Sequence, residues 1–428
     1  MTRSGRLFYG WVITAVCVVV YFFTNGLAVF VPQNLFPRYM ETFGATPAQV
    51  SPMVAITFAV AGVLAPFVGA AIDRFGVVRV IRTGLLVLGA TFAVYPLAQS
   101  LTQLYVLHVG VGLGLIFGGL MPNVVLLSRW FTARRGTVVG ILVAGSSLAG
   151  AILPVAISPL VNDPAWGWRY GLGALAIAFW VLAVLPAFRL LKESPAAVGQ
   201  YPDGADAPPA GEEDGARDGV PFATALRTRT FWCLAIGSAC LWFATQAMTS
   251  QVTIFFEQEG GLVPASATAL YSLLMGCSVA GKFLFGAVSD RFAKRRVMLV
   301  TSITLLAGCL LLFSRGPEGL ALTGDPLRLR LFAIVFGLGF GGCFTLIQLV
   351  AVESFGQREL GRILGVVTAV DTFGGVVGTL LGGQLRTATG DYFLPFGIVT
   401  LVAAFAVINV TLIRPVAAAR AAAGATAG

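Results

Sequence analysis

Long apolar runs separated by short polar loops dominate the hydrophobic pattern of the chain. We expect twelve membrane-spanning helices, near residues 9–31, 47–72, 80–98, 102–127, 137–160, 167–188, 230–256, 265–288, 297–313, 329–352, 361–385 and 392–413. Helices of about 18–27 residues cross a hydrocarbon core at 1.5 Å per residue. The runs are too long and too uniformly apolar for barrel strands. The first run is too long for a signal-peptide core, so we expect a retained span.

The composition agrees with this pattern. Of the 428 residues, 57% are hydrophobic and 11% are charged, and the mean hydropathy is +0.87. A soluble domain carries roughly 25% charged residues, so this chain could not cover a water-facing surface. We therefore predict an all-α membrane protein.

The basic residues indicate how the chain is oriented. With both termini in the cytoplasm, 21 of the 28 Lys and Arg residues fall on the cytoplasmic side and six on the opposite side, and Lys282 lies within a span. This bias is typical of a multi-pass protein of the plasma (inner) membrane with cytoplasmic termini. It also accounts for the net charge of +9. The basic residues are scattered over many loops, so nucleic acid is not an expected partner.

No pattern in the chain indicates catalysis. All six cysteines lie in predicted spans without metal-ligand spacing, and they are interpreted as apolar filling. We find no nucleotide-binding loop, metal cluster or nucleophile–base pair, so we expect neither an enzyme nor a cofactor nor a metal. Without an ATP-binding loop, any transport would draw on a gradient.

A polar stretch divides the chain into two halves. Residues 192–229 are rich in Pro, Gly, Ala and acidic residues over most of their length, so we expect a flexible cytoplasmic linker. It separates a six-helix bundle at 1–191 from another at 230–415, and residues 416–428 form an expected flexible tail.

The two halves share one loop sequence. GAAIDRFGVVRVIR begins at Gly69, after the second span, and GAVSDRFAKRRVML begins at Gly286, after the eighth. The matching positions indicate internal duplication. Duplicated helical bundles around a site near the bilayer midplane are typical of secondary transporters.

The loop G-x-x-x-D-R-x-G-x-x-R and its repeat resemble the signature loop of the major facilitator superfamily. The resemblance covers the whole twelve-span layout and implies two pseudo-symmetric six-helix bundles. It also implies a cytoplasmic latch, in which Asp73 and Asp290 face the helix N-termini near Gly361 and Gly136. A carboxylate at a helix N-terminus is stabilising. The gating residues expected in these loops are Asp73, Arg74, Asp290 and Arg291. The alternative is that these residues only anchor the loops.

A narrower resemblance concerns the segment WFTARRGTVVGILVAGSSLAG, the opening FYGWVI and the order K-x-x-x-G-x-x-S-D. These are similar to the monocarboxylate transporters and the bacterial oxalate–formate exchangers. In those families an arginine that pairs with the substrate carboxylate usually occupies the position of Lys282. The chain departs from them at Gln33, Ser278 and Asp371. The resemblance therefore implies the same fold, but it does not imply the same substrate or coupling ion.

Lys282 and Asp371 are the charges that we expect near the midplane. Lys282 lies eight residues from Asp290 and Asp371 ten residues past Gly361, which places them roughly 12 and 15 Å from the cytoplasmic surface. A charge at that depth is costly unless it is paired or lines a wet cavity. We therefore expect each to be the other's main partner.

A carboxylate substrate would compete with Asp371 for the Lys282 ammonium. Substrate binding would then favour a neutral Asp371, which would couple proton and anion binding. The alternative is a static ion pair, and a pair that neutralises itself also suits a neutral, zwitterionic or expelled substrate.

Other polar residues within spans are weaker candidates for substrate binding. They are Asn25, Gln33, His108 and Gln246, with Gln251 and Gln348 as further amides. An amide or imidazole buried in a span more often bonds a neighbouring helix. Glycines recur every four residues at Gly110, Gly114 and Gly118, at Gly136 and Gly140, and at Gly374, Gly378 and Gly382, which indicates close helix packing. Pro32, Pro122 and Pro154 lie within or near spans, where they could kink the helix.

The leading hypothesis is a secondary transporter of small organic anions, either monocarboxylates or dicarboxylates, working by alternating access. Symport with protons and exchange both stay open. The alternatives are an efflux transporter for drugs or other metabolites and a non-transporting membrane receptor or scaffold. The expected partners are the anion, protons and membrane lipids, and we expect a monomer.

Overall fold

The structure is a computed structural model that describes residues 8–165, 167–205, 219–316, 319–356 and 359–414. The expectations for the centre of the linker and for the tail 416–428 fall outside these residues. The chain divides into two compact units, which are described separately.

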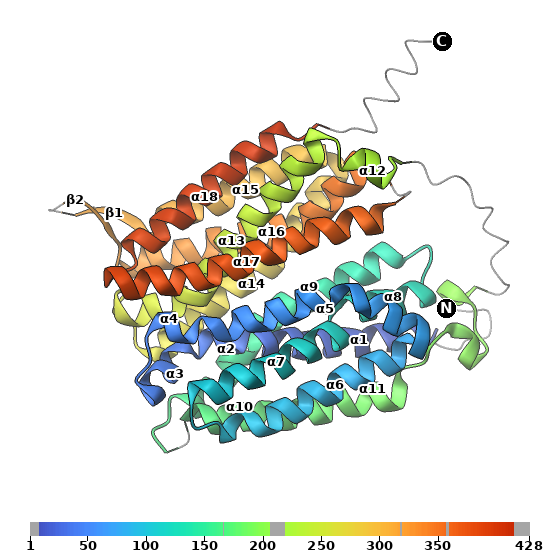
Figure 1. The fold of residues 1–428 in the computed structure, drawn as a ribbon, viewed down its shortest axis with the longest axis horizontal. Helices are drawn as coiled ribbons and strands as arrows, with labels where there is room; N and C mark the ends of the chain where they lie inside the picture. Colours follow the sequence, from blue (N-terminus) through green and yellow to red (C-terminus); the bar gives the residue numbers. More distant parts are fainter. Residues whose placement is uncertain (1–7, 166, 206–218, 317–318, 357–358, 415–428) are drawn as a thin grey trace, which may run out of the picture. The chain divides into compact units, whose positions relative to one another are not determined.

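Unit 1 is helical in its described residues (Figure 1). Its elements are α1 (Gly10–Asn25), η1 (Gly26–Phe30), α2 (Val31–Asn34), α3 (Phe36–Phe43), α5 (Pro52–Phe75), α6 (Val77–Val94), η2 (Tyr95–Leu97), α7 (Leu101–Gly118), α8 (Leu120–Trp130), α9 (Arg135–Val161), α10 (Gly167–Phe179), η3 (Trp180–Val184), α11 (Leu185–Leu190), η4 (Pro195–Val198) and η5 (Pro202–Gly204). The segments η1 and η3 are π-helical turns within the first and sixth expected spans.

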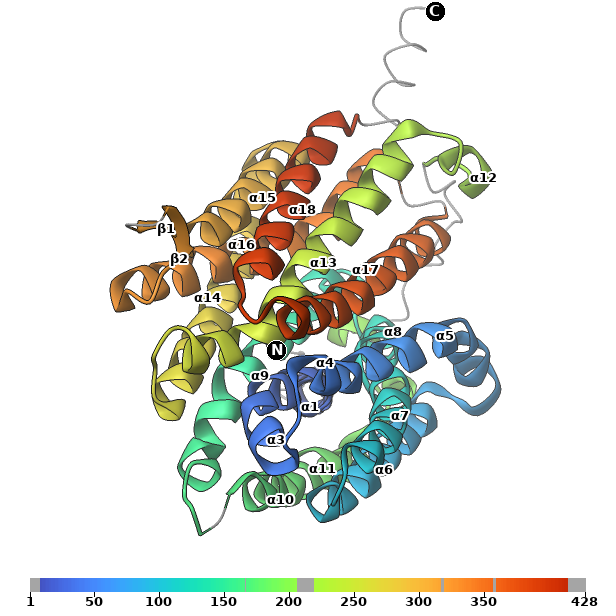
Figure 2. The same cartoon turned by 60° about the vertical axis from the view of Figure 1, so that its left-hand side comes forward.

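Unit 2 contains the remaining elements (Figures 1 and 2). They are α4 (Pro47–Val50), α12 (Phe222–Ala225), α13 (Arg229–Gln258), α14 (Pro264–Arg291), α15 (Lys294–Leu311), β1 (Phe313–Gly316), β2 (Gly319–Leu322), α16 (Pro326–Phe355), α17 (Leu360–Thr389) and α18 (Phe393–Leu412). The short α4 packs on α17, and Gln251 of α13 donates from Nε2 to Ser51 Oγ over 2.9 Å.

The predicted fold class, an all-α membrane protein, is confirmed. Within the described residues, eleven helices are long and apolar enough to cross a membrane. Helix α15 lies at the place of the ninth expected span. Because it begins with Lys294, Arg295 and Arg296, it is too highly charged to count among the eleven apolar helices. One local departure from the prediction is the antiparallel hairpin β1–β2, in which Phe313 pairs with Leu322.

Short polar residues and prolines set where helices begin and break. Ser100 accepts from Gln103 N at the start of α7, and Asp325 accepts from Leu327 N and Arg328 N at the start of α16. The fourth expected span breaks at Gly119, between α7 and α8. Pro122 has no N–H to continue the helix, and its ring crowds the carbonyl four residues earlier.

Asn123 compensates for this break. Its amide donates to the carbonyl oxygens of Gly118 and Gly119 over 2.9 and 2.6 Å. The buried carbonyl groups that lose a helical donor therefore have partners. The predicted effect of Pro122 on this span is confirmed.

Two of the three sets of glycines that recur every four residues lie at close helix contacts. A Cβ added at Gly374 or Gly378 of α17 would collide with the carbonyl oxygens of Ala239 and Phe243 of α13. The set in α7 similarly packs on α6, at Thr91, Leu88 and Gly84. The prediction was wrong for Gly136 and Gly140, where no described atom lies within 4 Å of an added Cβ. Spacing alone does not show which face of a helix meets a neighbour.

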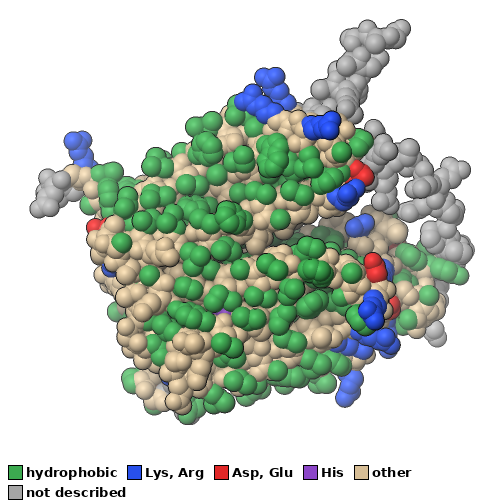
Figure 3. Space-filling model, in the orientation of Figure 1, with side chains coloured by type: hydrophobic (Ala, Val, Ile, Leu, Met, Phe, Trp, Pro, Cys, Tyr) green, Lys and Arg blue, Asp and Glu red, His purple; other side chains and the backbone are tan. Residues whose placement is uncertain are grey.

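The outer flanks of the helices are apolar, as a bilayer requires. Figure 3 shows hydrophobic side chains spread along the visible flanks, with most of the visible Lys and Arg side chains near helix ends. Examples are Val63, Phe373 and Leu401, whose side chains are 70–71% exposed.

Candidate functional site

Lys282 is buried in the middle of α14, with 8% of its surface exposed. Its Nζ atom lies 4.9 Å from the centre of the Phe344 ring of α16. An ammonium over an aromatic face is attracted by the negative face of the π-system. The charge predicted from the sequence therefore lies against an aromatic ring of unit 2.

The contact depends on how closely α14 and α16 approach. A Cβ added at Gly341 would collide with the Ser278 carbonyl oxygen and would lie 3.0 Å from the Lys282 backbone nitrogen. Only glycine leaves room for the two backbones at this point. Phe344 follows Gly341 by about one helical turn, so the close approach brings its ring over the amine.

Asp371 is buried in α17, with 6% of its surface exposed. Its carboxylate interacts with the hydroxyl group of Ser238 on α13. Its Oδ1 atom has no hydrogen-bond partner among the described residues. A buried carboxylate with an unused acceptor is suited to bind a donor group or a proton.

Lys282 and Asp371 do not form the direct ion pair that we expected from their similar depth in the membrane. No described Lys or Arg forms an ion pair with Asp371. The Phe344 ring contacts Trp242 of α13 instead, with ring centres 5.8 Å apart in a T-shaped arrangement. Trp242 lies 3.9 Å from a Cβ added at Gly375, one turn after Asp371. The aromatic pair thus extends from Lys282 to the part of α17 one turn beyond Asp371.

Gln246 extends this row of side chains along α13. It is 1% exposed, and its Cγ atom lies 3.2 Å from a Cβ added at Gly375. Its Nε2 atom has no hydrogen-bond partner among the described residues. A buried polar atom left unsatisfied costs about 1–3 kcal/mol. An unused donor on Gln246 and an unused acceptor on Asp371 therefore favour a polar ligand or water in this part of unit 2.

The candidate residues Asn25 and Gln33 belong to unit 1. Asn25 is half-buried and directly precedes the π-helical turn η1, and Gln33 is fully buried in α2. Such π-helical turns occur frequently at functional sites. A substrate-binding role for both residues stays a prediction.

His108 of α7 is fully buried, and both ring nitrogens have partners. Nδ1 lies 2.8 Å from Thr57 Oγ1 of α5, and Nε2 lies 2.9 Å from the Tyr95 hydroxyl of η2. The imidazole therefore joins three elements of unit 1. This arrangement favours a structural role, and substrate binding by His108 stays a prediction.

The four predicted gating residues lie at helix ends. Asp73 and Arg74 end α5, Asp290 and Arg291 end α14, and all four are exposed. The proposed latch joins residues of different units and stays a prediction.

The ordered start of the linker could not be predicted from its composition. Asp203 of η5 accepts hydrogen bonds from the backbone nitrogens of Thr132, Ala133 and Arg134, directly before α9. Partial burial alone would raise the pKa of Asp203, but these bonds and one from the Thr132 hydroxyl leave the pKa below its ordinary value. The carboxylate thus caps the entrance to α9.

A second acidic residue anchors the chain just before η4. Glu193 accepts from Val77 N and Val78 N at the start of α6, over 2.8 and 3.1 Å. It also pairs with Arg129 at 2.5 Å. Residues 192–204 of the expected flexible linker are therefore fixed to unit 1.

No group of three His, Cys, Asp or Glu side chains in the described ranges could hold a metal ion. The candidate site in unit 2 instead presents one ammonium, one carboxylate, one amide and two aromatic rings. This donor set suits an organic solute.

Comparison with known proteins agrees with the fold. The sequence profile of the Major Facilitator Superfamily matches residues 15–313 and again 261–427. A solved bacterial homolog of the human lysosomal transporter Spinster, in an inward-facing and unoccupied conformation, superposes with a TM-score of 0.69. The two sequences are 17% identical, and the superposition covers 97% of this chain and 96% of the Spinster homolog.

Two relatives show the range of functions near this sequence. The agnestins efflux protein AgnL12 of Paecilomyces divaricatus is 26% identical over 74% of this chain and 67% of its own length. Monocarboxylate transporter 13 of Bos taurus is 26% identical over 91% of this chain and 85% of its own length. The chain is a multi-pass membrane transporter that belongs to the Major Facilitator Superfamily.

Proposed function

We propose that the protein is a secondary active transporter of small organic anions, with mono- or dicarboxylates as substrates. The observation that carries this proposal is the buried Lys282 amine against Phe344, in a helix whose other charged residues, Asp290 and Arg291, lie at its end. An ammonium in an apolar span attracts an anion strongly, because little water screens it.

The substrate's apolar part would lie against the Trp242–Phe344 pair. Its carboxylate would face Lys282, and its polar substituents would face Gln246 and Asp371. Aromatic faces contribute apolar contact area beside a cation, as expected of a site for a small organic acid. Similarity to monocarboxylate transporter 13 supports the same substrate class.

Asp371 supplies a candidate for proton coupling. A proton on Asp371 removes a negative charge near the substrate and turns an acceptor into a donor. Proton and anion binding would then reinforce each other. We propose proton symport, with anion exchange as the other coupling mode.

We further propose that the protein acts as a monomer in the plasma (inner) membrane with cytoplasmic termini. The bias of Lys and Arg toward the expected cytoplasmic loops supports this orientation. Alternating access would involve the two units and the latch residues Asp73, Arg74, Asp290 and Arg291.

Efflux of a larger metabolite is the second candidate function. Similarity to the agnestins efflux protein AgnL12 supports it. The unused Oδ1 of Asp371 also supports it, because a carboxylate can hold the donor groups of a neutral or cationic compound.

The test is uptake by the purified protein in proteoliposomes. Labelled lactate, oxalate and formate are supplied with and without an inward proton gradient. We expect saturable uptake of at least one of them, inhibited by the unlabelled acid. Absence of carboxylate uptake, with gradient-driven export of a neutral or cationic compound, would favour efflux.

A further inference from the structure

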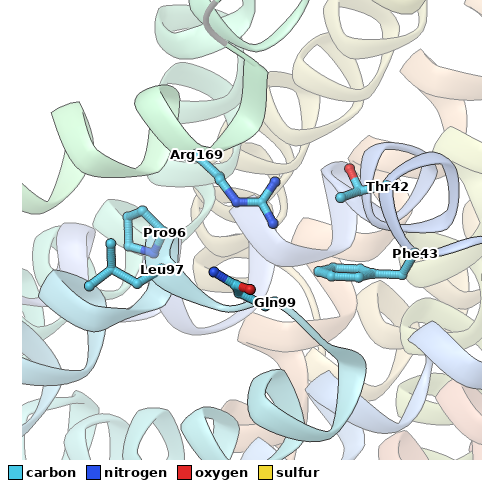
Figure 4. A pocket seen from close by; sticks show the side chains of 6 residues that line it. All are labelled: Thr42, Phe43, Pro96, Leu97, Gln99 and Arg169. Carbon is cyan, nitrogen blue, oxygen red and sulfur yellow. The ribbon is translucent and has the colours of Figure 1, made fainter.

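A cavity of about 490 Å³ opens at the end of unit 1 where α3 ends and α10 begins. It is lined by Thr42, Phe43, Pro96, Leu97, Gln99 and Arg169. Figure 4 shows the Arg169 guanidinium extending between Gln99 and the side of the cavity formed by Thr42 and Phe43. A cationic group therefore lines the cavity.

The charge of Arg169 is not neutralised within the described residues. Nη2 donates to the Ala98 carbonyl oxygen over 2.9 Å, and the guanidinium carbon lies 4.4 Å from the centre of the Trp168 ring. No described Asp or Glu forms an ion pair with it. A guanidinium held on two sides with further N–H groups available is suited to bind phosphate or carboxylate oxygens.

A second cavity of about 370 Å³ adjoins the first at Leu97. It is lined by Val94, Leu97, Ala98, Thr102, Gln103, Val106 and Leu107. The side chains of Val94, Leu97 and Val106 are 51%, 69% and 67% exposed. Exposed apolar residues on a membrane-spanning helix face hydrocarbon, so this cavity suits an acyl chain.

We propose that the two cavities together bind one phospholipid. The phosphodiester lies against Arg169, and one acyl chain lies along Val94, Leu97 and Val106. The arrangement places a guanidinium, which can bind phosphate oxygens, at the polar end of an apolar groove. A water-soluble anion would use only the first cavity, whereas a lipid explains both. An anionic headgroup is favoured, because a zwitterionic one carries its own cation.

Native mass spectrometry of the purified full chain tests the headgroup contact. We expect the protein to retain phosphatidylglycerol in preference to phosphatidylcholine. Arg169→Gln should lower phosphatidylglycerol retention about fivefold, the effect of one basic residue near an anionic lipid. Arg169→Lys keeps the charge and should keep the preference. Arg315→Gln removes an arginine of β1 that lines neither cavity, and it should change nothing.

The acyl contact is tested in the same way. Val106→Gln should also lower phosphatidylglycerol retention, because a polar side chain would then line the apolar groove. Ile177→Gln is the matched control, since Ile177 is 68% exposed on α10 and lines neither cavity. Glycerol 1-phosphate, which has no acyl chain, should not displace the lipid.

Three outcomes would overturn the proposal. They are unchanged lipid retention by Arg169→Gln, equal losses in Val106→Gln and Ile177→Gln, and displacement of the lipid by glycerol 1-phosphate. The last result would leave a site for small soluble anions only.

Discussion

The Nζ atom of Lys282 lies 4.9 Å from the centre of the Phe344 ring, so the charge of α14 meets an aromatic face of α16. The same ring contacts Trp242 of α13, which lies one turn after Ser238, the residue that interacts with Asp371. Lys282 and Asp371 form no ion pair, and the Phe344–Trp242 contact runs from Lys282 to the part of α13 that borders Asp371. A solute could therefore contact Lys282 without first breaking a salt bridge to Asp371.

Gly341→Ala should disturb this arrangement without changing a polar side chain. The added methyl would collide with the Ser278 carbonyl, so α16 must shift and carry Phe344 away from Lys282. We expect a loss of about 1–3 kcal/mol in the free energy of unfolding from overpacking. We also expect a higher KM for carboxylate uptake. Gly276→Ala in α14 is the control, because no described atom lies within 4 Å of its added Cβ. Equal KM values in the two variants would contradict the positioning role of Gly341.

Asp371→Asn tests proton coupling. The amide keeps the size of the side chain but cannot take up a proton. Wild-type uptake should rise when an inward proton gradient is imposed, and uptake by the variant should not respond to it. Asp391→Asn removes an exposed carboxylate outside the membrane-spanning helices and should retain the response. A variant that still responds to the gradient would exclude Asp371 as the proton carrier.

Tyr95→Phe tests the role of His108. It removes the hydroxyl bonded to Nε2 and leaves a buried ring nitrogen without that partner. We expect the free energy of unfolding to fall by about 1–3 kcal/mol, with an unchanged KM. His108→Gln should lower thermal stability in the same way. A raised KM at unchanged thermal stability in His108→Gln would instead assign His108 to substrate binding.

Asp203→Asn tests the ordered start of the linker. The lowered pKa means that the carboxylate stabilises the folded state above about pH 4, the ordinary range of Asp. This stabilisation is lost as the pH falls through the lower pKa of the folded state. The variant should therefore show faster hydrogen exchange at residues 132–134 than wild type at pH 7, with a smaller difference below pH 4. Asp163→Asn, which affects only the turn at Ala165, should exchange as wild type does at 132–134. A pH-independent difference would contradict the carboxylate's role.

The helical spans and the burial of Lys282 and Asp371 could be predicted from the sequence, whereas the bounds of the two bundles stay a prediction. Long apolar runs leave few structural choices in a bilayer, and a duplicated loop marks the repeat directly. The positions of Lys282 and Asp371 along their apolar runs also placed both charges within membrane spans.

The pairing of these charges could not be predicted. Depth along a helix does not determine the direction in which a side chain points, and Asp371 lies by Ser238 rather than by Lys282. Phe344 and Trp242 carry no distinguishing signal in a chain with 32 phenylalanines and seven tryptophans. The ordered start of the linker was hidden by a composition typical of disorder, although Asp203 and Glu193 each bind backbone N–H groups of unit 1.

Uptake of a labelled carboxylate by Lys282→Ala, in proteoliposomes, tests the central claim most directly. Removing the only described cation buried in the apolar spans should lower uptake about 10- to 100-fold, the effect of one charge-assisted contact. Lys294→Ala, at the start of α15, should transport as wild type does. Carboxylate uptake by a folded Lys282→Ala protein at the wild-type rate and KM would contradict the proposed anion site.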